Sequence, residues 1–307
     1  MENYVSFSPH IKKNTTSNKL YLIIAISLLP TLLAGIIFFG FRSVLILLVS
    51  MVGVIGSEIA FNFVKYKKFV FNDYSTVVVG LLIALTMPPN LPILCPLLGA
   101  MLSNILVKNC MGGVGKSIVS EVAFAKVITF VAFSVASSCY IEALGGEQTS
   151  ITMLSRIISE EPVKEGIASL LLGSNVGAIG ETAILFILAG GITLCVLKII
   201  DYKVPLVYLV TVLFIGVLCF GVSDAFMLLC AGGAVLCAFY LLTDYSIVPK
   251  TLLGKTIYGV GAGLITVLYW KFGKTPDLGA FYAVLIVGLV ANAIKGFYRP
   301  RIVGEKK

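Results

Sequence analysis

Long apolar runs without charge alternate with short polar connections along most of the chain. The run Leu20–Phe39, for example, contains no charged residue. A helix needs about 20 apolar residues to cross the hydrocarbon core of a bilayer, and lipid offers no partners to exposed backbone groups. The pattern therefore predicts an all-α polytopic membrane protein with about ten transmembrane helices, at roughly 20–41, 44–64, 76–89, 93–108, 119–140, 181–200, 204–222, 225–243, 255–271 and 279–297.

The predicted helices fall into two sets of equal number, separated by the one long connection. The third helix of the first set ends at Pro88-Pro89, and the third of the second set ends shortly before Pro249. Proline-broken helices at corresponding positions, ending on opposite sides, are typical of an inverted five-plus-five repeat. The alternative is that both are ordinary helix ends that carry proline. The predicted regions are a tail at 1–19, a first five-helix repeat at 20–140, a loop at 141–180, a second five-helix repeat at 181–297 and a basic tail at 298–307.

The placement of basic residues predicts the orientation. Charged residues are only 12% of the chain although its net charge is +8, and lysine and arginine favour the cytoplasmic side. If the helices alternate from an inner N-terminus, most basic residues lie on the inner side, whereas the outer ends carry Arg42, Arg156, Lys164, Lys271 and Lys274. Both termini are therefore expected in the cytoplasm and the acidic 141–180 loop outside. Since the basic residues are spread over many inner loops, binding to nucleic acid is not expected.

Few residues suit catalysis or metal binding. The single histidine, His10, lies in the N-terminal tail, and the seven cysteines form no C-x-x-C pair. Gly112–Ser117 resembles part of a phosphate-binding loop, but Cys110 stands where the first glycine belongs and no strand precedes it. We interpret it as a flexible basic inner loop. The sequence thus predicts no catalytic residue and no metal ligand.

Charged residues in or beside predicted helices are candidates for function, because placing them in lipid is costly. Glycines also precede the sixth helix, where backbone can approach a ligand closely and helix N–H groups are free. Glu181 has two open interpretations, a functional carboxylate or one that complements the helix dipole. The charged candidates are Glu58, Glu121, Lys126, Glu181 and Asp224, and the predicted cofactor-binding residues of the glycine stretch are Gly177, Gly180, Glu181 and Thr182.

Several segments, in order over nearly the whole chain, together resemble the D subunit of the Rnf-type ion-translocating electron-transfer complex. They also resemble its relative, the B subunit of the sodium-pumping NADH:quinone reductase. The segments are Ser8-Pro9-His10, Gly80–Pro89, Gly112–Lys116, Gly177–Thr182, Ala238–Asp244 and Tyr298–Arg301. The short polar stretch before the first helix favours the Rnf subunit, because the quinone-reductase subunit carries a longer extension there.

The resemblance implies a covalent flavin. The family carries FMN joined through its phosphate to a threonine in an outward loop between the fifth and sixth helices, attached by a flavin transferase. The matching stretch here is Glu147–Leu154, with Thr152 as acceptor and Thr149 as the fallback. Two positions depart from the family pattern, since Ile151 replaces the usual alanine and Glu147 the commoner aspartate. The resemblance also implies a non-covalent riboflavin towards the inner side, for which Thr243 and Asp244 are candidates.

The function implied is that of a membrane flavoprotein in a prokaryotic cell (inner) membrane. It would carry electrons through covalent FMN in a complex that couples ferredoxin:NAD electron transfer to translocation of Na⁺ or H⁺. Its partners would be the other Rnf-type subunits, especially an outward-facing flavin subunit, besides the transferase and the lipid bilayer. The alternatives are the quinone-reductase B subunit, a channel or secondary transporter with the inverted-repeat fold, and a purely structural subunit without cofactor.

Overall fold

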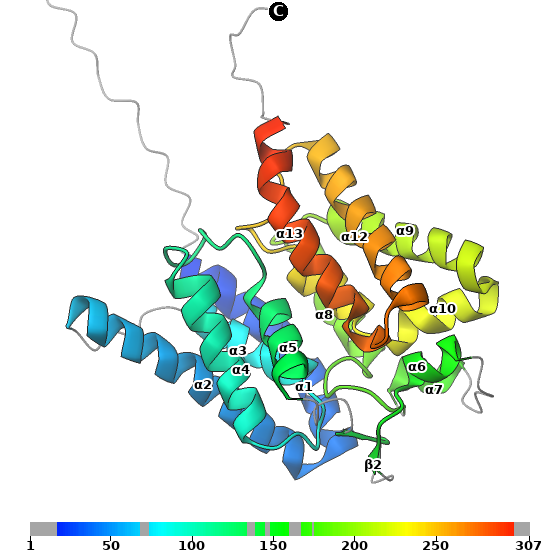
Figure 1. Cartoon of the computed structure of the whole chain (residues 1–307), viewed down its shortest axis with the longest axis horizontal. Helices are drawn as coiled ribbons and strands as arrows, with labels where there is room; N and C mark the ends of the chain where they lie inside the picture. Colours follow the sequence, from blue (N-terminus) through cyan, green and yellow to red (C-terminus); the bar gives the residue numbers. More distant parts are fainter. Residues whose placement is uncertain are drawn as a thin grey trace, which may run out of the picture.

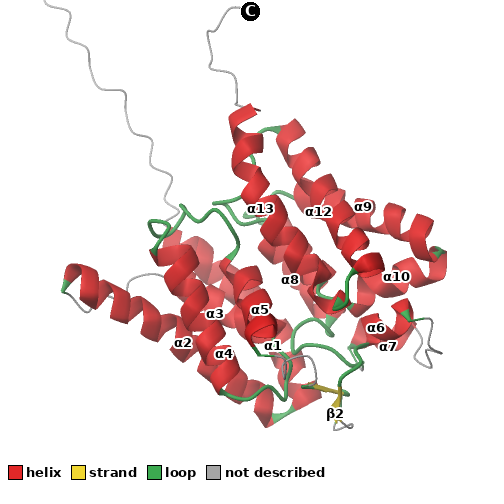
Figure 2. Cartoon of the chain, in the orientation of Figure 1, coloured by secondary structure: helices red, strands yellow, loops and turns green. Residues whose placement is uncertain are grey.

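The computed structural model describes residues 17–67, 74–133, 139–144, 148–159, 167–173 and 175–297. Within these ranges the chain is mostly helical (Figure 2), and its helices form two groups that lie side by side (Figure 1). Some predicted features fall outside the described residues. They are the tails at 1–16 and 298–307 with their motifs and His10, and the loop residues Glu147 and Lys164.

The first group contains the helices of the N-terminal half. The long helix α2 packs against both α3 and α4, while α4 also packs on α5 and α1 packs on α3. Pro92 and Pro96 flank the start of α4, where a helix tolerates proline. The elements are α1 (Ser17–Phe39), α2 (Phe41–Tyr66), α3 (Tyr74–Thr86), α4 (Leu94–Ser103), the π-helix η1 (Asn104–Asn109) that continues α4, and α5 (Glu121–Ala132).

The second group repeats much of this packing. Here α9 packs against α10 and α12, and α12 packs on α13. The two groups meet where α1 packs on α8 and α5 on α13. The elements are α8 (Ile184–Val196), α9 (Lys203–Phe220), α10 (Val222–Ala231), α11 (Ala234–Leu236), the π-helix η3 (Cys237–Leu241), α12 (Leu252–Phe272), the 3₁₀ turn η4 (Pro276–Leu278) and α13 (Gly279–Phe297).

A short irregular region connects the two groups at one end of the molecule (Figure 1). Strands β1 (Tyr140–Ile141) and β2 (Gln148–Thr149) pair antiparallel and are followed by α6 (Met153–Ile158) and α7 (Ile167–Leu172). The amide of Leu144 donates to Phe38 at the end of α1, which places this region beside the C-terminal end of that helix. The C-terminal end of α13 lies at the opposite end of the molecule (Figure 1).

The predicted count of about ten membrane-spanning helices is not confirmed. Among the described residues, 5 helices are long and apolar enough to cross a membrane, or 6 if the pair bent by 68° at Gly232-Gly233 forms one span. The others are shorter, with 13 residues in α3 and 12 in α5. The long helices expose large apolar side chains such as Ile37 and Phe272. Water-soluble proteins rarely expose such extensive apolar surface, so these side chains are expected to face lipid.

The broken segments lie at the centre of the molecule. Nearly all of α3 is buried, and so are α11 and η3 from Ala234 to Leu242. Around them, several polar and charged side chains are also buried, including Lys108 and Lys126. Buried charges are stable only with partners, so these residues mark where a site can be sought.

Candidate functional site

The glycine stretch before α8 pairs with the unwound end of α3. The Gly180 amide donates to the carbonyl oxygen of Leu85 at 2.7 Å, and the Ile179 amide donates to that of Met87 at 3.2 Å. A Cβ on Gly180 would lie 2.6 Å from the Leu85 Cβ, so only glycine permits this approach. Both amides are therefore bonded to backbone carbonyl oxygens of the chain itself, and Gly180 allows its segment to pack closely against the end of α3.

Glu181 forms a buried ion pair with Lys126 of α5. The Lys126 Nζ lies 3.4 Å from Glu181 Oε1 and also donates to the carbonyl oxygen of Thr86. The same ammonium lies 4.7 Å from the Phe130 ring centroid and 5.4 Å from that of Phe281, within the range of cation–π attraction. Glu181 therefore neutralises a cation that the first half brings to the contact between the two groups.

The helix-capping interpretation of Glu181 is wrong. Helix α8 begins at Ile184 with Ala183 as its N-cap, and its first turn contains no acidic residue. The segment before it bends back onto α3 through the hydrogen bonds of Ile179 and Gly180. Because the chain is held there by tertiary contacts, the apolar run begins before the helix does.

Thr152 is the N-cap of α6 and is 2% exposed. Its hydroxyl donates to Asp277 Oδ1 at 2.6 Å, and its oxygen accepts from the Ser155 amide at 3.2 Å. The Ser155 hydroxyl lies 2.9 Å away. Asp277 belongs to η4, immediately before α13, so the contact joins the connecting region to the second group.

The other predicted residues lie around these contacts. The amide of Met153 donates to Val176 at 3.4 Å, and Gly177 forms a bridge with Ile141, so the structure brings the Thr152 segment next to the glycine stretch. Thr182 is buried, and its hydroxyl has no hydrogen-bond partner among the described residues. Thr149, the fallback acceptor, is half-buried and its Oγ1 accepts from the Ile151 amide at 3.1 Å.

Asp277 is the residue of this cluster that sequence reasoning missed. It follows Pro276 just before an apolar run, and an acidic residue beside a predicted membrane helix is a usable signal. Its partner Thr152 is 125 residues away, however, and nothing in the pattern of either segment indicates that they meet.

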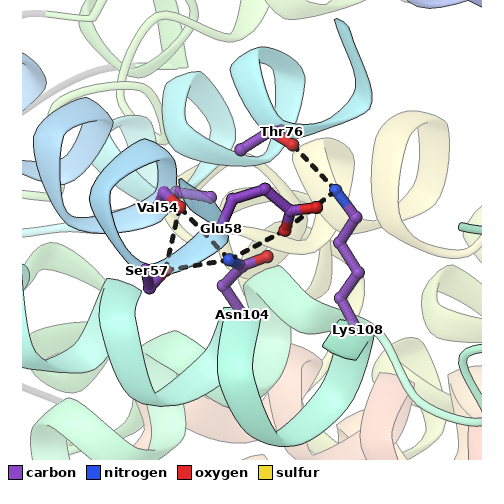
Figure 3. A network of polar contacts seen from close by, with 6 residues as sticks. All are labelled: Val54, Ser57, Glu58, Thr76, Asn104 and Lys108. Carbon is purple, nitrogen blue, oxygen red and sulfur yellow. Dashed lines mark hydrogen bonds and ion pairs between the residues drawn. The ribbon is translucent and has the colours of Figure 1, made fainter. Parts of the chain in front are cut away.

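A second buried ion pair lies within the first group (Figure 3). Lys108 of η1 is 3.4 Å from Glu58 Oε2 of α2, and its ammonium donates to the Thr76 hydroxyl at 2.7 Å. The Asn104 side-chain amide, one turn earlier on η1, donates to Ser57 at 2.8 Å and to Glu58 at 3.2 Å. All of these side chains are buried. The network fixes η1 against α2 and α3, which is a structural use of Glu58.

A cavity of about 90 Å³ lies between the two groups, away from the connecting region. Among its lining residues, Ser75 Oγ and Glu121 Oε2 are buried and have no hydrogen-bond partner among the described residues. The lining includes Ser75, Val79 and Leu82 of α3, Ser117, Ser120, Glu121 and Val122, Phe239 and Tyr240 of η3, and Thr243 to Ser246.

The mouth of this cavity is held by contacts between the two groups. Asp244 accepts from the Ser246 hydroxyl at 2.6 Å, and Ser117 donates to the same hydroxyl oxygen at 3.0 Å. The predicted inner loop at Gly112–Ser117 thus borders the cavity, since Val114 and Gly115 line it. Unpaired polar atoms in a mostly apolar cavity between helices are typical of sites for small organic ligands.

Comparison with models of known protein families identifies one that matches nearly the whole chain. Residues 4–304 match the model of the NQR2, RnfD, RnfE family. The chain belongs to that family. The match covers both helical groups, the connecting region and the cavity.

Relatives in this family align with the chain over nearly its whole length. It is 29% identical to the D subunit of the Na⁺-translocating ferredoxin:NAD⁺ oxidoreductase complex of Acetobacterium woodii, covering 99% of this chain and 96% of the relative. It is 25% identical to the D subunit of the proton-translocating ferredoxin:NAD⁺ oxidoreductase complex of Clostridium ljungdahlii, with the same coverage. The D subunit of the ion-translocating oxidoreductase complex of Escherichia coli is 25% identical over 99% of both chains.

Proposed function

We propose that this chain is the membrane flavoprotein subunit of an Rnf-type complex that couples ferredoxin:NAD electron transfer to translocation of Na⁺ or H⁺. The observation that carries the proposal is the similarity to two such D subunits over 99% of the chain. In this role the protein is an electron carrier within a translocase. It works with the other subunits, in particular an outward-facing flavin subunit, and with a transferase that attaches its flavin.

The first cofactor we propose is FMN, joined through its phosphate to Thr152. Thr152 supplies the hydroxyl that the phosphoester needs, and in this structure that hydroxyl donates to the Asp277 carboxylate at 2.6 Å. The packing around it does not leave space, since Thr152 is 2% exposed, so a phosphoester fits only after the segment moves. When bound, FMN supplies reversible electron transfer. The chain supplies the threonine tether, and Lys126 is the cation nearest the acidic groups Glu181 and Asp277.

The second cofactor we propose is a non-covalent riboflavin at this cavity, whose walls would have to move apart to admit a flavin ring. A flavin ring needs apolar walls and a few polar partners. Val79, Leu82 and Phe239 provide the walls, and Ser75 and Glu121 provide unpaired polar atoms. Thr243 and Asp244, the candidates from the sequence, also line the cavity, although the Thr243 hydroxyl donates to the Phe239 carbonyl oxygen at 2.5 Å.

We propose that the two helical groups are inverted repeats. Their packing corresponds pair by pair, because α2 contacts α3 and α4 as α9 contacts α10 and α12, and α4 contacts α5 as α12 contacts α13. The first helices of the two groups, α1 and α8, pack on each other, as expected near a two-fold axis. In the proposed orientation the Thr152 region faces outward, and the cavity opens towards the cytoplasm, where both termini lie.

The family model also covers the quinone-reductase subunit, which is the second candidate function. It shares the proposed flavins and differs in both the electron donor and the electron acceptor. Purified membranes containing the complete complex would reduce NAD with ferredoxin under the first proposal and quinone with NADH under the second. A channel or transporter would carry no flavin at all.

The covalent flavin is tested on denaturing gels. The full chain is co-expressed with a flavin transferase as wild type, Thr152→Ala and Thr149→Ala, and each band is examined for flavin fluorescence and intact mass. We expect one FMN adduct on the wild type and on Thr149→Ala, and none on Thr152→Ala. A wild-type band without flavin, in the presence of a transferase shown to be active on another substrate, would remove the covalent cofactor from the proposal.

A further inference from the structure

The contact between Thr152 and Asp277 uses the hydroxyl that a flavin would need. The single hydroxyl proton is directed at Asp277 Oδ1, 2.6 Å away, and the oxygen also accepts from the Ser155 amide. Hydrogen bonds to a charged acceptor are among the stronger ones in proteins. With its side chain also buried, Thr152 in this arrangement is closed to another protein's active site.

The packing of α6 strengthens this docked arrangement. Met153, Leu154 and Ile157 are buried, and α6 packs on α10 and η4. A Cβ on Gly232 would lie 2.5 Å from the Leu154 Cδ1, so Leu154 rests directly on the break between α10 and α11. The Thr152 segment, defined here as residues 148–159, is therefore held at both its polar and its apolar contacts.

The chemistry of attachment conflicts with the docked contact. From a flavin dinucleotide donor, the bond from Thr152 Oγ1 to the FMN phosphorus forms while the phosphorus–oxygen bond to AMP breaks. AMP leaves and the hydroxyl proton is released. The product is a phosphodiester with one negative charge, and Oγ1 has no proton left to donate. An anion at this position would face the Asp277 carboxylate without the hydrogen bond that now joins them.

Asp277 is not left without compensation when Thr152 moves away. It is partly exposed, and the Lys126 ammonium attracts its carboxylate. The polar part of the contact can therefore open at the cost of one charge-assisted hydrogen bond, while the Asp277 carboxylate keeps its partial exposure and the attraction of Lys126. Opening is reversible for the unmodified chain and is favoured once the phosphodiester is present.

On this basis, and resting on the proposed flavin at Thr152, we infer that Asp277 is a positioning residue that holds the Thr152 segment in a docked, unreactive state. Flavin attachment takes place on the undocked segment. The modified chain then keeps Thr152 away from Asp277, so that attachment changes how α6 sits on η4 and on the α10–α11 break.

The test uses the full chain purified without a transferase, as wild type, Asp277→Asn, Asp277→Ala and the control Asp224→Asn. Asp224 is an exposed acidic residue in the first turn of α10. It is not among the hydrogen-bond partners of the Thr152 hydroxyl, which are Asp277 and Ser155. Two quantities are measured: amide hydrogen exchange of the peptide covering 150–158 without flavin, and the initial rate of FMN attachment after a transferase and FAD are added.

We expect Asp277→Ala to speed both exchange and attachment by about tenfold or more, because a tenfold change corresponds to about 1.4 kcal/mol, close to the lower end of what a hydrogen bond to a charged group contributes. Asp277→Asn keeps a neutral acceptor and should give a smaller increase, whereas Asp224→Asn should match the wild type. If Asp277→Ala does not fold, the inference is tested with Asp277→Asn, from its hydrogen exchange at 150–158 and its rate of FMN attachment. The flavin-loaded wild type should exchange faster at 150–158 than the flavin-free chain.

Two results would overturn the inference. Slower attachment in both Asp277 variants would mean that Asp277 assists the reaction on the docked hydroxyl. Unchanged exchange and unchanged attachment would mean that the contact does not control access. A wild-type chain that accepts no FMN from an active transferase overturns the proposed function instead, and hydrogen exchange in the Asp277 variants still decides whether Asp277 holds the segment.

Discussion

Lys126 on α5 and Glu181 before α8 form an ion pair at 3.4 Å with both side chains almost fully buried. The two residues come from different halves of the chain, and the Lys126 ammonium also binds the carbonyl oxygen of Thr86 where α3 ends. The pair therefore ties three segments together, at the point where the second half re-enters the protein interior.

Removing one partner of this pair is expected to destabilise the protein strongly. Lys126→Met or Glu181→Gln should each cost about 3–5 kcal/mol, because the remaining group is left buried and uncompensated. The double variant should cost less than the sum of the two. Unfolding in detergent would measure this, with Lys255→Met as control, since the Lys255–Asp201 pair is 18% and 34% exposed and such pairs contribute about 0–1 kcal/mol. Equal losses for Lys126→Met and Lys255→Met would contradict the prediction.

Gly180→Ala is expected to destabilise the protein by about 1–3 kcal/mol, because the added methyl group would overlap Leu85, to whose Cβ it would come within 2.6 Å. The matched control is Gly56→Ala on α2, where a Cβ meets nothing within 4 Å. The control should be neutral or stabilising by up to about 1 kcal/mol, because alanine favours helix. Melting temperatures of the two purified variants would separate them, and a loss in both or in neither would argue against close backbone contact at Gly180.

Filling the cavity should remove riboflavin without affecting the covalent flavin. Val79→Trp adds a large ring at a lining position, and we expect at least about tenfold less riboflavin per chain, since the loss of shape complementarity costs more than about 1.4 kcal/mol. The fluorescent band from Thr152 should persist. Val131→Trp, on the exposed face of α5, is the control for the bulk of tryptophan. Flavin released by denaturation is quantified by chromatography, and full riboflavin content in Val79→Trp would place the ligand elsewhere.

The Asp201–Lys255 pair gives a pH dependence outside the membrane helices. Burial alone would raise the pKa of Asp201, but hydrogen bonds from the Lys255 ammonium and the Lys203 amide outweigh it, and the pKa lies below its ordinary value of 3.8. A carboxylate whose pKa is lowered in the folded state stabilises that state fully at a pH above its ordinary pKa. This contribution is lost as the pH falls through the lowered pKa of the folded state.

Asp201→Asn should therefore be less stable than the wild type at about pH 7. The difference should shrink progressively below about pH 4, because the wild-type carboxylate then becomes protonated and loses its charge. The asparagine amide of the variant is uncharged at every pH. Thermal unfolding of the two proteins in the same detergent over this pH range measures it. A difference that stays constant as the pH falls would show that Asp201 contributes through packing and not through its charge.

The positions of helices can be predicted from the sequence because lipid requires helical backbone wherever an apolar run is long. The contacts made by helix ends inside the protein cannot be predicted. Helix α3 ends at Thr86, close to the end that Pro88-Pro89 predicts, but the hydrogen bonds of Leu85 and Met87 with Gly180 and Ile179 depend on residues far along the chain. The predicted count of about ten spans is not confirmed among the described residues, and the apolar pattern places Glu181 in a helix that begins three residues later.

Residues of the candidate site can be predicted from the sequence only where they differ clearly from their surroundings, as charged residues do within apolar runs. Lys126 and Glu181 stand out as charges in apolar surroundings, although not as a pair. Thr152 comes from resemblance to a family motif, and its role as flavin acceptor stays a prediction. Asp277 could not be linked to it, since the contact between them arises from folding of the connecting region onto the start of α13.

The shortness of α3 has an electrical consequence. Its first turn carries Ser75, which lines the cavity, and its last residue, Thr86, binds the Lys126 ammonium. At about 1.5 Å per residue these ends are about 17 Å apart, against about 30 Å for the hydrocarbon core. Water or a polar ligand in the cavity would bring one boundary of the apolar layer to Ser75, so the membrane voltage would fall over a thinner layer than the ~30 Å of plain bilayer. A charge moving from the cavity towards Thr86 would then experience a larger share of the ~2.3 kcal/mol per 100 mV of a full crossing than the same displacement in plain bilayer.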